Sequence, residues 1–265
     1  MTDPVEQGPN AQDGGARAVA NEGIVLRDVH KTLGNRAILR GMSFSVPRGT
    51  NFVIMGGSGT GKSVTLRHVI GILKPDRGSI RVGGLEVPEL DSAGLMQLRR
   101  RMGYLFQNGA LINWLSVADN VGLPLREHAR ELSKAQVRER VMRVLEMVGM
   151  AHAADQTPDG ISGGMRLRTG LARAIVNEPE FVLYDEPNAG LDPMMSDQIH
   201  ELIVRVRDEL HVTGLIVTHS RACATTCGNR IGVVKEGVVV AQGTPAELDA
   251  SDDPLVRSFL GGGAD

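Results

Sequence analysis

The sequence predicts an α/β fold in which a mostly parallel β-sheet carries helices on both faces. Short, mainly apolar runs are typical of strands buried on both sides, and they occur at 52–55, 181–184 and 215–218. Helical patterns alternate with these runs, at about 62–73, 162–177 and 194–210. A glycine-rich loop at 56–61 joins the first run to the first helix. Such alternation indicates a parallel sheet covered by helices.

Other elements are expected around this core. Strands are predicted at 24–26 and 37–46. The stretch from about 90 to 165 is mostly helical and interrupts the alternation, so we interpret it as a helical subdomain inserted into one α/β core. One of its helices should run from Ser133 to Gly149, because the Ser-x-x-Gln pattern at its start forms a capping box and valines recur on one face.

Three segments are expected along the chain. Residues 1–22 contain few large apolar side chains and are predicted to form a disordered tail. Residues 23–245 should form one folded domain that includes the helical subdomain. Residues 246–265 are expected to form a C-terminal helical extension and tail.

The totals exclude several classes of protein. A net charge of -2 and only eight aromatic residues (one Trp, two Tyr, five Phe) argue against a nucleic-acid partner. Two cysteines are too few for a disulfide framework. No segment approaches the ~18 uninterrupted apolar residues that span a bilayer, and the N-terminus lacks an apolar signal core. We therefore expect a cytoplasmic protein, with any membrane role exerted through partners.

Residues 56–63 fit the phosphate-loop pattern G-x-x-x-x-G-K-[ST] between a strand and a helix. Glycines let the backbone approach a triphosphate, successive N–H groups form an anion nest, and the following helix adds its positive end. Lys62 should reach the β- and γ-phosphates of a nucleoside triphosphate, and the Ser63 hydroxyl should coordinate Mg²⁺. The expected nucleotide-binding residues here are Gly56, Gly57, Ser58, Gly59, Thr60, Gly61, Lys62, Ser63 and Val64.

An acidic pair follows the second apolar run. Asp185 ends a buried strand and should project at the carboxyl edge of the sheet, where such sheets bind ligands. It is the candidate Mg²⁺ ligand, acting through water. Glu186 is the candidate general base that polarises the water attacking the γ-phosphorus.

A second small-residue turn, Ile161–Ser162–Gly163–Gly164–Met165, enters a helix about twenty residues before the acidic pair. Together with the phosphate loop, and in this order, it resembles the ATP-binding-cassette (ABC) ATPases over roughly residues 24–245. The resemblance implies a P-loop NTPase of the ABC type, with a RecA-like core sheet, an antiparallel β subdomain and the inserted helical subdomain.

The resemblance also implies that Ser162, Gly163 and Gly164 complete the phosphate site of an opposite subunit. Because the chain has one phosphate loop and one such signature, two copies facing head to tail would make two complete sites. An ATP-sandwich homodimer is the economical inference, and a heterodimer with a related cassette is the alternative. ATP would close this dimer and hydrolysis would release it.

Three further residues match functional positions of the family. Gln107 corresponds to the glutamine that reaches Mg²⁺ and the attacking water, and His219 to the histidine on the γ-phosphate. Asp192 is the acidic member of a loop, 188–192, that crosses the dimer interface. Taken alone, Gln107 could be a polar loop residue and His219 a helix cap.

A metal site is a second reading of His219, Cys223 and Cys227, which would share one face of a continuous helix. We set it aside, because His219 already has a role and no fourth ligand is evident.

Within the family, the chain resembles the ATPases of MCE-associated lipid transporters, the Mla-type phospholipid system and its relatives. The resemblance rests on segments at 106–111, 119–121, 124–128 and 251–260, and on Met165 after the signature glycines. It implies integral-membrane permease subunits, an MCE-domain protein and, in some relatives, a small STAS-domain protein on the helical subdomain. The chain would lie peripherally on the inner face of the membrane. Alternatives are an ABC ATPase for another cargo and a regulatory ABC ATPase that moves none.

Two positions carry specific expectations. Leu33 occupies the place where many cassettes have an aromatic residue that stacks on adenine, so base selectivity should be loose. Trp114 lies in an apolar loop with Leu111, Ile112 and Leu115, and two interpretations stay open for it. It either belongs to a socket for a permease helix or fills the core of the helical subdomain.

Overall fold

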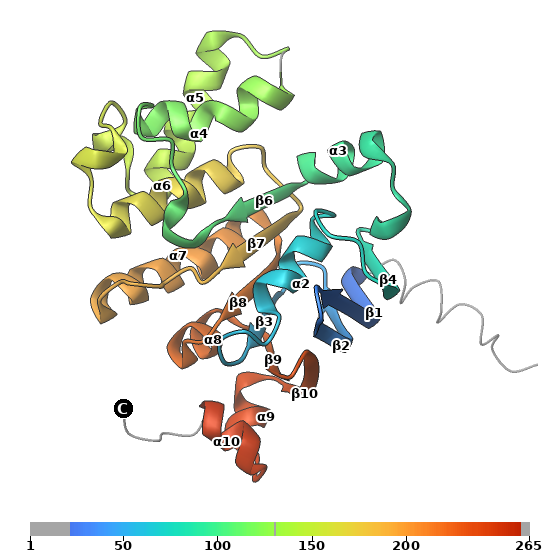
Figure 1. The fold of residues 1–265 in the computed structure, drawn as a ribbon. Helices are drawn as coiled ribbons and strands as arrows, with labels where there is room; N and C mark the ends of the chain where they lie inside the picture. The colour runs from blue at the N-terminus through green and yellow to red at the C-terminus, as the bar shows by residue number, and fades with distance from the viewer. Residues whose placement is uncertain (1–21, 130, 261–265) are drawn as a thin grey trace, which may run out of the picture.

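The computed structural model describes residues 22–129 and 131–260, which form two β-sheets, the helices packed on them and a helical lobe (Figure 1). The larger sheet has the strand order β10-β9-β3-β8-β7-β6. Its members are β3 (Asn51–Met55), β6 (Met102–Leu105), β7 (Phe181–Asp185), β8 (Thr213–Thr218), β9 (Arg230–Lys235) and β10 (Val238–Gly243). All neighbours pair in parallel except β9 and β10, which are antiparallel.

The three apolar runs recognised in the sequence are the centre of this sheet. Every residue of β3 is buried, and its side chains alternate between two cores. Val53 and Met55 face the core beneath α6, α7 and α8, whereas Phe52 and Ile54 face the core that contains α2. Burial on both faces explains why the strand is apolar at successive positions rather than at every second one.

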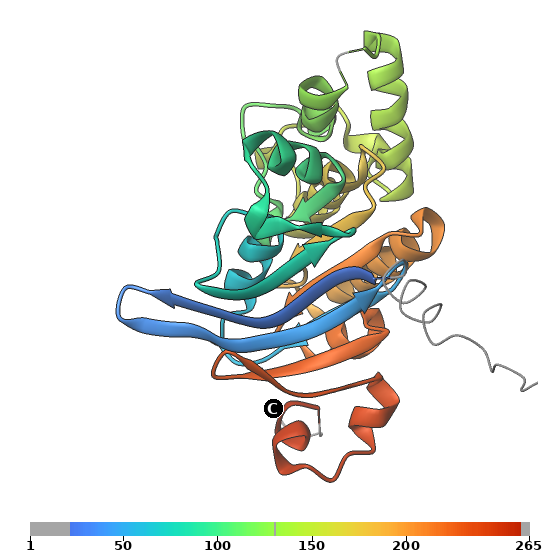
Figure 2. The ribbon, with the colours of Figure 1, turned by 90° about the vertical axis from the view of Figure 1, so that its right-hand side faces the viewer.

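The smaller sheet is antiparallel, with the order β2-β1-β4-β5. It consists of β1 (Glu22–Leu33), β2 (Arg36–Pro47), β4 (Arg77–Val82) and β5 (Leu85–Glu86). Its long β1–β2 hairpin extends past the larger sheet (Figure 2). Helix α2 (Lys62–Val69) shares one core with both sheets, and Leu66 and Val69 are wholly buried there.

Helix α2 is shorter than the helix expected at 62–73. Gly71, with φ of 71°, takes the left-handed conformation that ends a helix. The N–H groups of Ile72 and Leu73 both turn back to the carbonyl of Arg67. The helix therefore stops at this glycine, before Pro75.

The helical lobe follows β6. It contains α4 (Val117–His128) and α5 (Lys134–Met147), and α6 (Gly163–Ile175) connects it to the larger sheet. The capping box expected at the start of α5 is present, with both Ser133 and Gln136 bonded to the other's backbone N–H. The stretch 90–165 also contains α3 (Ser92–Arg100) and the core strand β6, so the part made only of helices and loops begins after Leu105.

The remaining helices complete the layers. Helices α7 (Pro193–Leu210) and α8 (Arg221–Cys227) cover the face of the larger sheet opposite α2. Two short helices, α9 (Pro245–Asp249) and α10 (Pro254–Leu260), follow β10. Residues 1–21 of the expected tail, and residues 261–265, lie outside the described residues.

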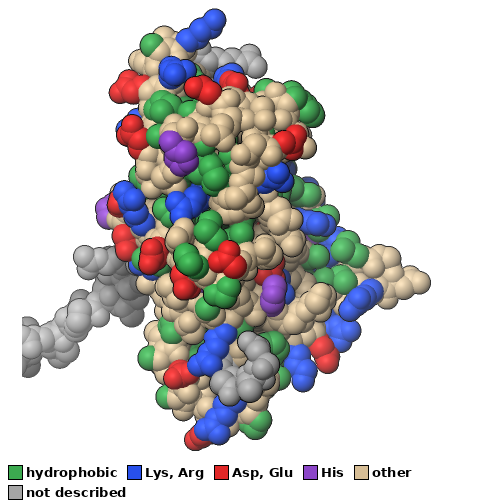
Figure 3. All heavy atoms as spheres, turned by 90° about the vertical axis from the view of Figure 1, so that its left-hand side faces the viewer, with side chains coloured by type: hydrophobic (Ala, Val, Ile, Leu, Met, Phe, Trp, Pro, Cys, Tyr) green, Lys and Arg blue, Asp and Glu red, His purple; other side chains and the backbone are tan. Residues whose placement is uncertain are grey.

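Two features concern contact with a membrane: the length and apolarity of the helices, and the distribution of charge on the surface. Within the ranges that the structure describes, no helix combines the length and apolarity needed to cross a bilayer. On the face shown in Figure 3, basic and acidic side chains are interspersed.

Candidate ATP-binding and hydrolysis site

A cavity of about 720 Å³ opens where four parallel strands of the larger sheet end. The loops that follow β3, β6, β7 and β8 meet there, which is the position where open α/β sheets bind ligands. Predicted residues from all four loops line it. They are Gly57, Ser58, Gly59, Gly61, Lys62, Ser63, Val64, Gln107, Glu186 and His219.

The phosphate loop has the strand–loop–helix setting that its sequence pattern requires. Gly61 caps α2 with φ of 98°, and a Cβ at this position would lie 2.7 Å from Leu39 Cδ2, so only glycine fits. Gly56 and Thr60 do not line the cavity: a Cβ on Gly56 would lie 2.5 Å from the carbonyl oxygen of Val234, and Thr60 Oγ1 donates to the carbonyl of Gly57 at 2.9 Å. The N-terminus of α2 therefore faces the cavity with its positive end.

Lys62 is the cation closest to the loop carbonyls. Its side chain is 8% exposed, and Nζ donates to the carbonyls of Gly56 and Gly57 at 2.8 and 3.0 Å. Nζ also lies 3.7 Å from Glu186 Oε1. A triphosphate in the cavity would compete with these partners for the same ammonium, because phosphate oxygens carry more negative charge than carbonyls.

Asp185 and Ser63 offer a pair of oxygen ligands. Ser63 Oγ donates to Asp185 Oδ1 at 2.9 Å, and the phenol of Tyr104 donates to Asp185 Oδ2 at 3.1 Å. Ser63 lines the cavity, whereas Asp185 does not line it and is joined to it through this hydrogen bond. Carboxylate and hydroxyl oxygens are the donors that a hard cation such as Mg²⁺ prefers, and the residues therefore fit that ion.

Glu186 lies between the lysine and the predicted histidine. Its Oε2 accepts from the Nδ1 and the backbone N–H of His219, at 2.9 and 3.2 Å, with the ring tautomer assigned accordingly. Its side chain is 15% exposed, whereas that of His219 is 68% exposed. Glu186 also has φ of 48°, a left-handed conformation that is uncommon for a residue other than glycine and that concentrates at functional positions.

Gln107 begins a segment with an unusual backbone. Asn108, Gly109 and Ala110 have φ values of 59°, 77° and 44°, so three successive residues are left-handed. Arg173 of α6 holds this turn by donating to the carbonyls of Gly109 and Ala110, at 2.7 and 2.9 Å. The segment that follows Gln107 is thereby tied to the helix that begins with the signature.

The signature residues do not line this cavity. Ser162 caps α6 by accepting from the N–H of Met165, and Ser162 and Gly163 are both exposed. Asp192 caps α7 in the same way by accepting from the N–H of Met195. A Cβ on Gly164 would lie 2.2 Å from Met195 Cε, so the absence of a side chain lets the two helix starts pack together. Ser162, Gly163 and Asp192 are therefore exposed outside this cavity, whereas Gly164 is buried.

Several residues of the cavity were not predicted. Arg36, Ile38 and Ala189 also line it. Leu33, expected at the adenine position, is 40% exposed and does not line the cavity. Arg36 and Ile38 follow Leu33 in the next strand, β2. Their position in the cavity wall depends on the geometry of the β1–β2 hairpin, which no local sequence pattern specifies.

For the described part of the chain, the interpretation that His219, Cys223 and Cys227 form a metal site is wrong. No group of three or more His, Cys, Asp or Glu side chains that could hold a metal ion occurs there. Cys223 and Cys227 are wholly buried in α8, whereas His219 precedes the helix and is exposed.

Trp114 is 82% exposed, so the interpretation that it fills the core of the helical lobe is also wrong.

Comparisons with known proteins agree with this geometry. A model of the family described as "ABC transporter" matches residues 39–189. The chain is 40% identical over 249 residues to the intermembrane phospholipid transport system ATP-binding protein MlaF of Escherichia coli, covering 94% of this chain and 92% of MlaF. It is 38% identical over 249 residues to the probable ribonucleotide transport ATP-binding protein mkl of Mycobacterium leprae, covering 94% of this chain and 72% of that protein.

Two solved structures are similar. A dimeric post-hydrolysis state of the ATP-binding cassette MJ0796, bound to ADP and Pi, has a TM-score of 0.76 and 31% identity, covering 83% of this chain and 98% of that one. The structure of cbiO1 from Clostridium perfringens, part of the transporter complex cbiONQ, has a TM-score of 0.81 and 30% identity, covering 88% and 92%. Fold, site and sequence coincide over most of the chain, which therefore belongs to the ABC transporter family as an ATP-binding and ATP-hydrolysing subunit.

Proposed function

We propose that the chain powers a membrane lipid transporter of the MCE/Mla type, with phospholipid as the cargo class. The observation that carries this proposal is the 40% identity to the E. coli phospholipid transport ATPase over almost the full length of both chains. The match spans 94% of this chain. The alternative is another cargo, favoured by the name of the mycobacterial relative, which refers to ribonucleotide transport.

The site supports an assignment of roles for hydrolysis. Lys62 would hold the β- and γ-phosphates, while Ser63, Asp185 and Gln107 would hold Mg²⁺, which neutralises phosphate charge when bound. Glu186 would accept the proton of the attacking water as it adds to the γ-phosphorus. His219, 2.9 Å from Glu186, would orient that carboxylate and contact the γ-phosphate.

The exposed signature supports a dimer in which each copy completes the site of the other. Ser162, Gly163 and Gly164 begin a helix of thirteen residues, whose N-terminal dipole favours an anion. Asp192 begins α7 beside it. Both starts would face the γ-phosphate bound by the phosphate loop of a second copy.

The permease would contact the loop that carries Trp114. Asn120 is wholly buried and shapes this loop, because its Oδ1 accepts from the N–H of Ile112 at 2.7 Å and its Nδ2 donates to the carbonyls of Ile112 and Leu115. A loop held this firmly presents the indole to solvent at little entropic cost on binding. Exposed aromatic residues of this kind are common anchors of interfaces. Attachment through this loop would place the chain peripherally on the inner face of the membrane.

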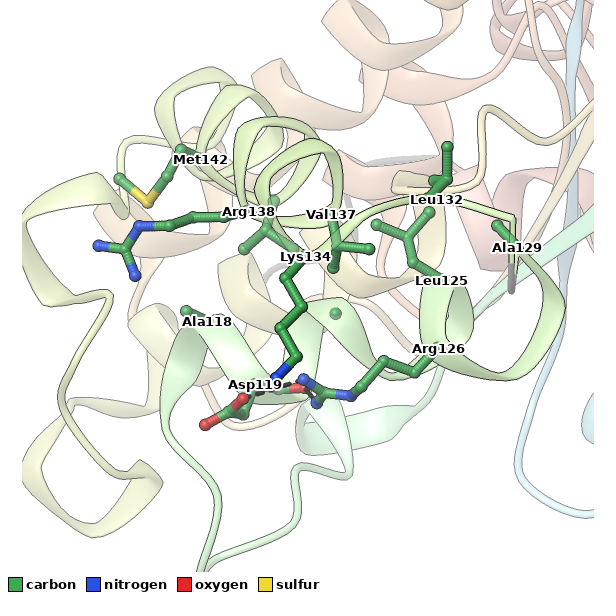
Figure 4. A pocket seen from close by; sticks show the side chains of 12 residues that line it. Ala118, Asp119, Leu125, Arg126, Ala129, Leu132, Lys134, Val137, Arg138 and Met142 are labelled. Atoms are coloured by element: carbon green, nitrogen blue, oxygen red, sulfur yellow. Dashed lines mark hydrogen bonds and ion pairs between the residues drawn. The ribbon is translucent and has the colours of Figure 1, made fainter.

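A groove on the helical lobe supports a further partner, a small STAS-domain protein. It has a volume of about 610 Å³ and lies between α4 and α5 (Figure 4). Leu125, Leu132 and Val137 form part of its apolar wall, and Lys134 and Arg138 supply positive charge. An amphipathic segment with acidic flanks would fit it. The MCE-domain protein would bind the permease beyond the membrane rather than this chain.

The experiment that tests the proposal is purification of the tagged chain from detergent-solubilised membranes, with mass spectrometry of the co-purifying proteins and lipids. Recovery of a permease, an MCE-domain protein and enriched phospholipid is the expected result. A permease with a soluble solute-binding protein, or no transporter at all, would refute the lipid assignment and leave the ATPase assignment intact. Lys134→Glu combined with Arg138→Glu should release a STAS-domain protein while retaining the permease.

A further inference from the structure

Tyr104 lies beside the acidic pair because of the register of two parallel strands. In β6 and β7, Tyr104 pairs with Leu183. Side chains two residues apart on a strand share a face, so Asp185 points to the same side of the sheet as Leu183 and Tyr104. This is also the side that carries α2 and the phosphate loop. The phenol therefore reaches the carboxylate that the sequence assigns to Mg²⁺.

The Asp185 carboxylate is held from two directions. Ser63 donates to Oδ1 at 2.9 Å, and Tyr104 donates to Oδ2 at 3.1 Å. The χ2 torsion of aspartate has only broad preferences, so a carboxylate with one donor can rotate away from a ligand position. A second donor on the other oxygen opposes that rotation.

The ring of Tyr104 is fixed as well. It stacks on Phe106, with centroids 4.1 Å apart and an interplanar angle of 27°. Phe106 immediately precedes Gln107, so the hydroxyl that touches Asp185 and the glutamine of the cavity are carried by one short, stacked segment. Tyr184 makes a contrast, because its hydroxyl is buried without a hydrogen-bond partner.

We infer that Tyr104 is a positioning residue for ATP hydrolysis, whose hydroxyl fixes Asp185 in the orientation that holds Mg²⁺. This inference rests on the proposed role of Asp185 and Ser63 as Mg²⁺ ligands. Mg²⁺ demands near-ideal octahedral geometry, whereas Ca²⁺ accepts irregular sets of oxygens. Loss of the hydroxyl should therefore weaken Mg²⁺ binding more than Ca²⁺ binding.

The test is Tyr104→Phe, which keeps the ring and its stack and removes only the donor. Affinity for a non-hydrolysable ATP analogue is measured by calorimetry in Mg²⁺, in Ca²⁺ and in EDTA. The gain in affinity due to Mg²⁺ should fall roughly tenfold, as expected for a lost hydrogen bond to a charged group. The gain due to Ca²⁺ should fall less, and affinity in EDTA should stay within about twofold. Tyr184→Phe is the matched control and should leave all three affinities unchanged.

The possible results distinguish a failure of the positioning role of Tyr104 from a failure of the proposed Mg²⁺ site at Asp185 and Ser63. If Mg²⁺ gives the wild-type chain no gain in affinity, the proposed metal site is wrong. If the wild-type gain is present and Tyr104→Phe retains it, Tyr104 does not position Asp185. An equal loss in Mg²⁺, Ca²⁺ and EDTA would mean that the residue acts only in packing, which also overturns the inference.

Discussion

Glu180 and two arginines form an ion cluster at the edge of the larger sheet opposite the nucleotide cavity. Arg101 binds the carboxylate through two nitrogens, at 2.7 and 2.9 Å, and Arg48 donates to it at 2.9 Å. The three residues precede β7, β6 and β3, so the cluster joins the amino ends of these strands. We expect Glu180→Gln to destabilise the protein at neutral pH.

The size of the effect follows from the pKa of Glu180. Mainly through the hydrogen bonds of Arg101, this pKa falls from its ordinary value of 4.5 to about 2. At about 1.36 kcal/mol per pKa unit, the fall corresponds to an upper limit of about 3 kcal/mol. Because the side chain is 42% exposed, solvent screening reduces the expected loss to about 1 kcal/mol.

The pH dependence has a definite sign. The pKa is lower in the folded state, so the carboxylate stabilises the fold fully above about pH 4.5, and this stabilisation disappears as the pH falls toward about 2. Measured by urea unfolding, the free energy of unfolding of the wild-type protein should exceed that of Glu180→Gln by about 1 kcal/mol near pH 7. The difference should be less than half of that near pH 3. Glu178→Gln is the control, because the carboxylate of Glu178 lies 3.8 Å from Arg143, longer than any of the contacts of Glu180 given above. Equal differences at both pH values, or none near pH 7, would refute the reasoning.

Three further predictions concern function. Glu186→Gln should lower the ATPase rate about 10²- to 10⁴-fold and leave ATP binding intact, as measured by steady-state turnover and equilibrium titration; an unchanged rate would remove Glu186 as the base. Leu33 lies outside the cavity, and no Phe, Tyr or Trp side chain is among the described residues that line it, so GTP should be hydrolysed at a rate comparable with that of ATP; much slower GTP turnover would count against loose selectivity. Trp114→Ala should retain ATPase activity and thermal stability but lose co-purification of the permease, because the indole is 82% exposed; a large fall in melting temperature would contradict the docking role.

The parts of the fold that could be predicted are those specified by neighbouring residues. The strand predicted at 181–185 has the same bounds as β7. It could be recognised because a strand buried on both faces is apolar at successive positions. The start of α5 followed from one capping box. The short strand β6 was hidden between helices, because its four residues alternate between buried and partly buried positions and are too few to show a period.

The candidate site divides in the same way. Gly56–Ser63, Asp185 and Glu186 could be proposed from the sequence because the pattern of a phosphate loop and of a strand end lies in consecutive residues. Contacts across the sheet could not be found. The Tyr104–Asp185 hydrogen bond joins positions 81 residues apart and depends on a strand register that no local pattern reveals.

The contact between Gly164 and Met195 has a consequence for how a pair of subunits would engage. The terminal methyl of Met195, in the first turn of α7, occupies the space that a Cβ on Gly164 would need, so the first turns of α6 and α7 are in contact, and we expect the signature and the loop at Asp192 to move together. In a dimer, the signature and Asp192 of a partner copy would therefore approach the bound nucleotide together, as one rigid unit. Intermediates in which only one of the two groups contacts the partner's nucleotide should be sparsely populated. Closure of the dimer should therefore be a single concerted step.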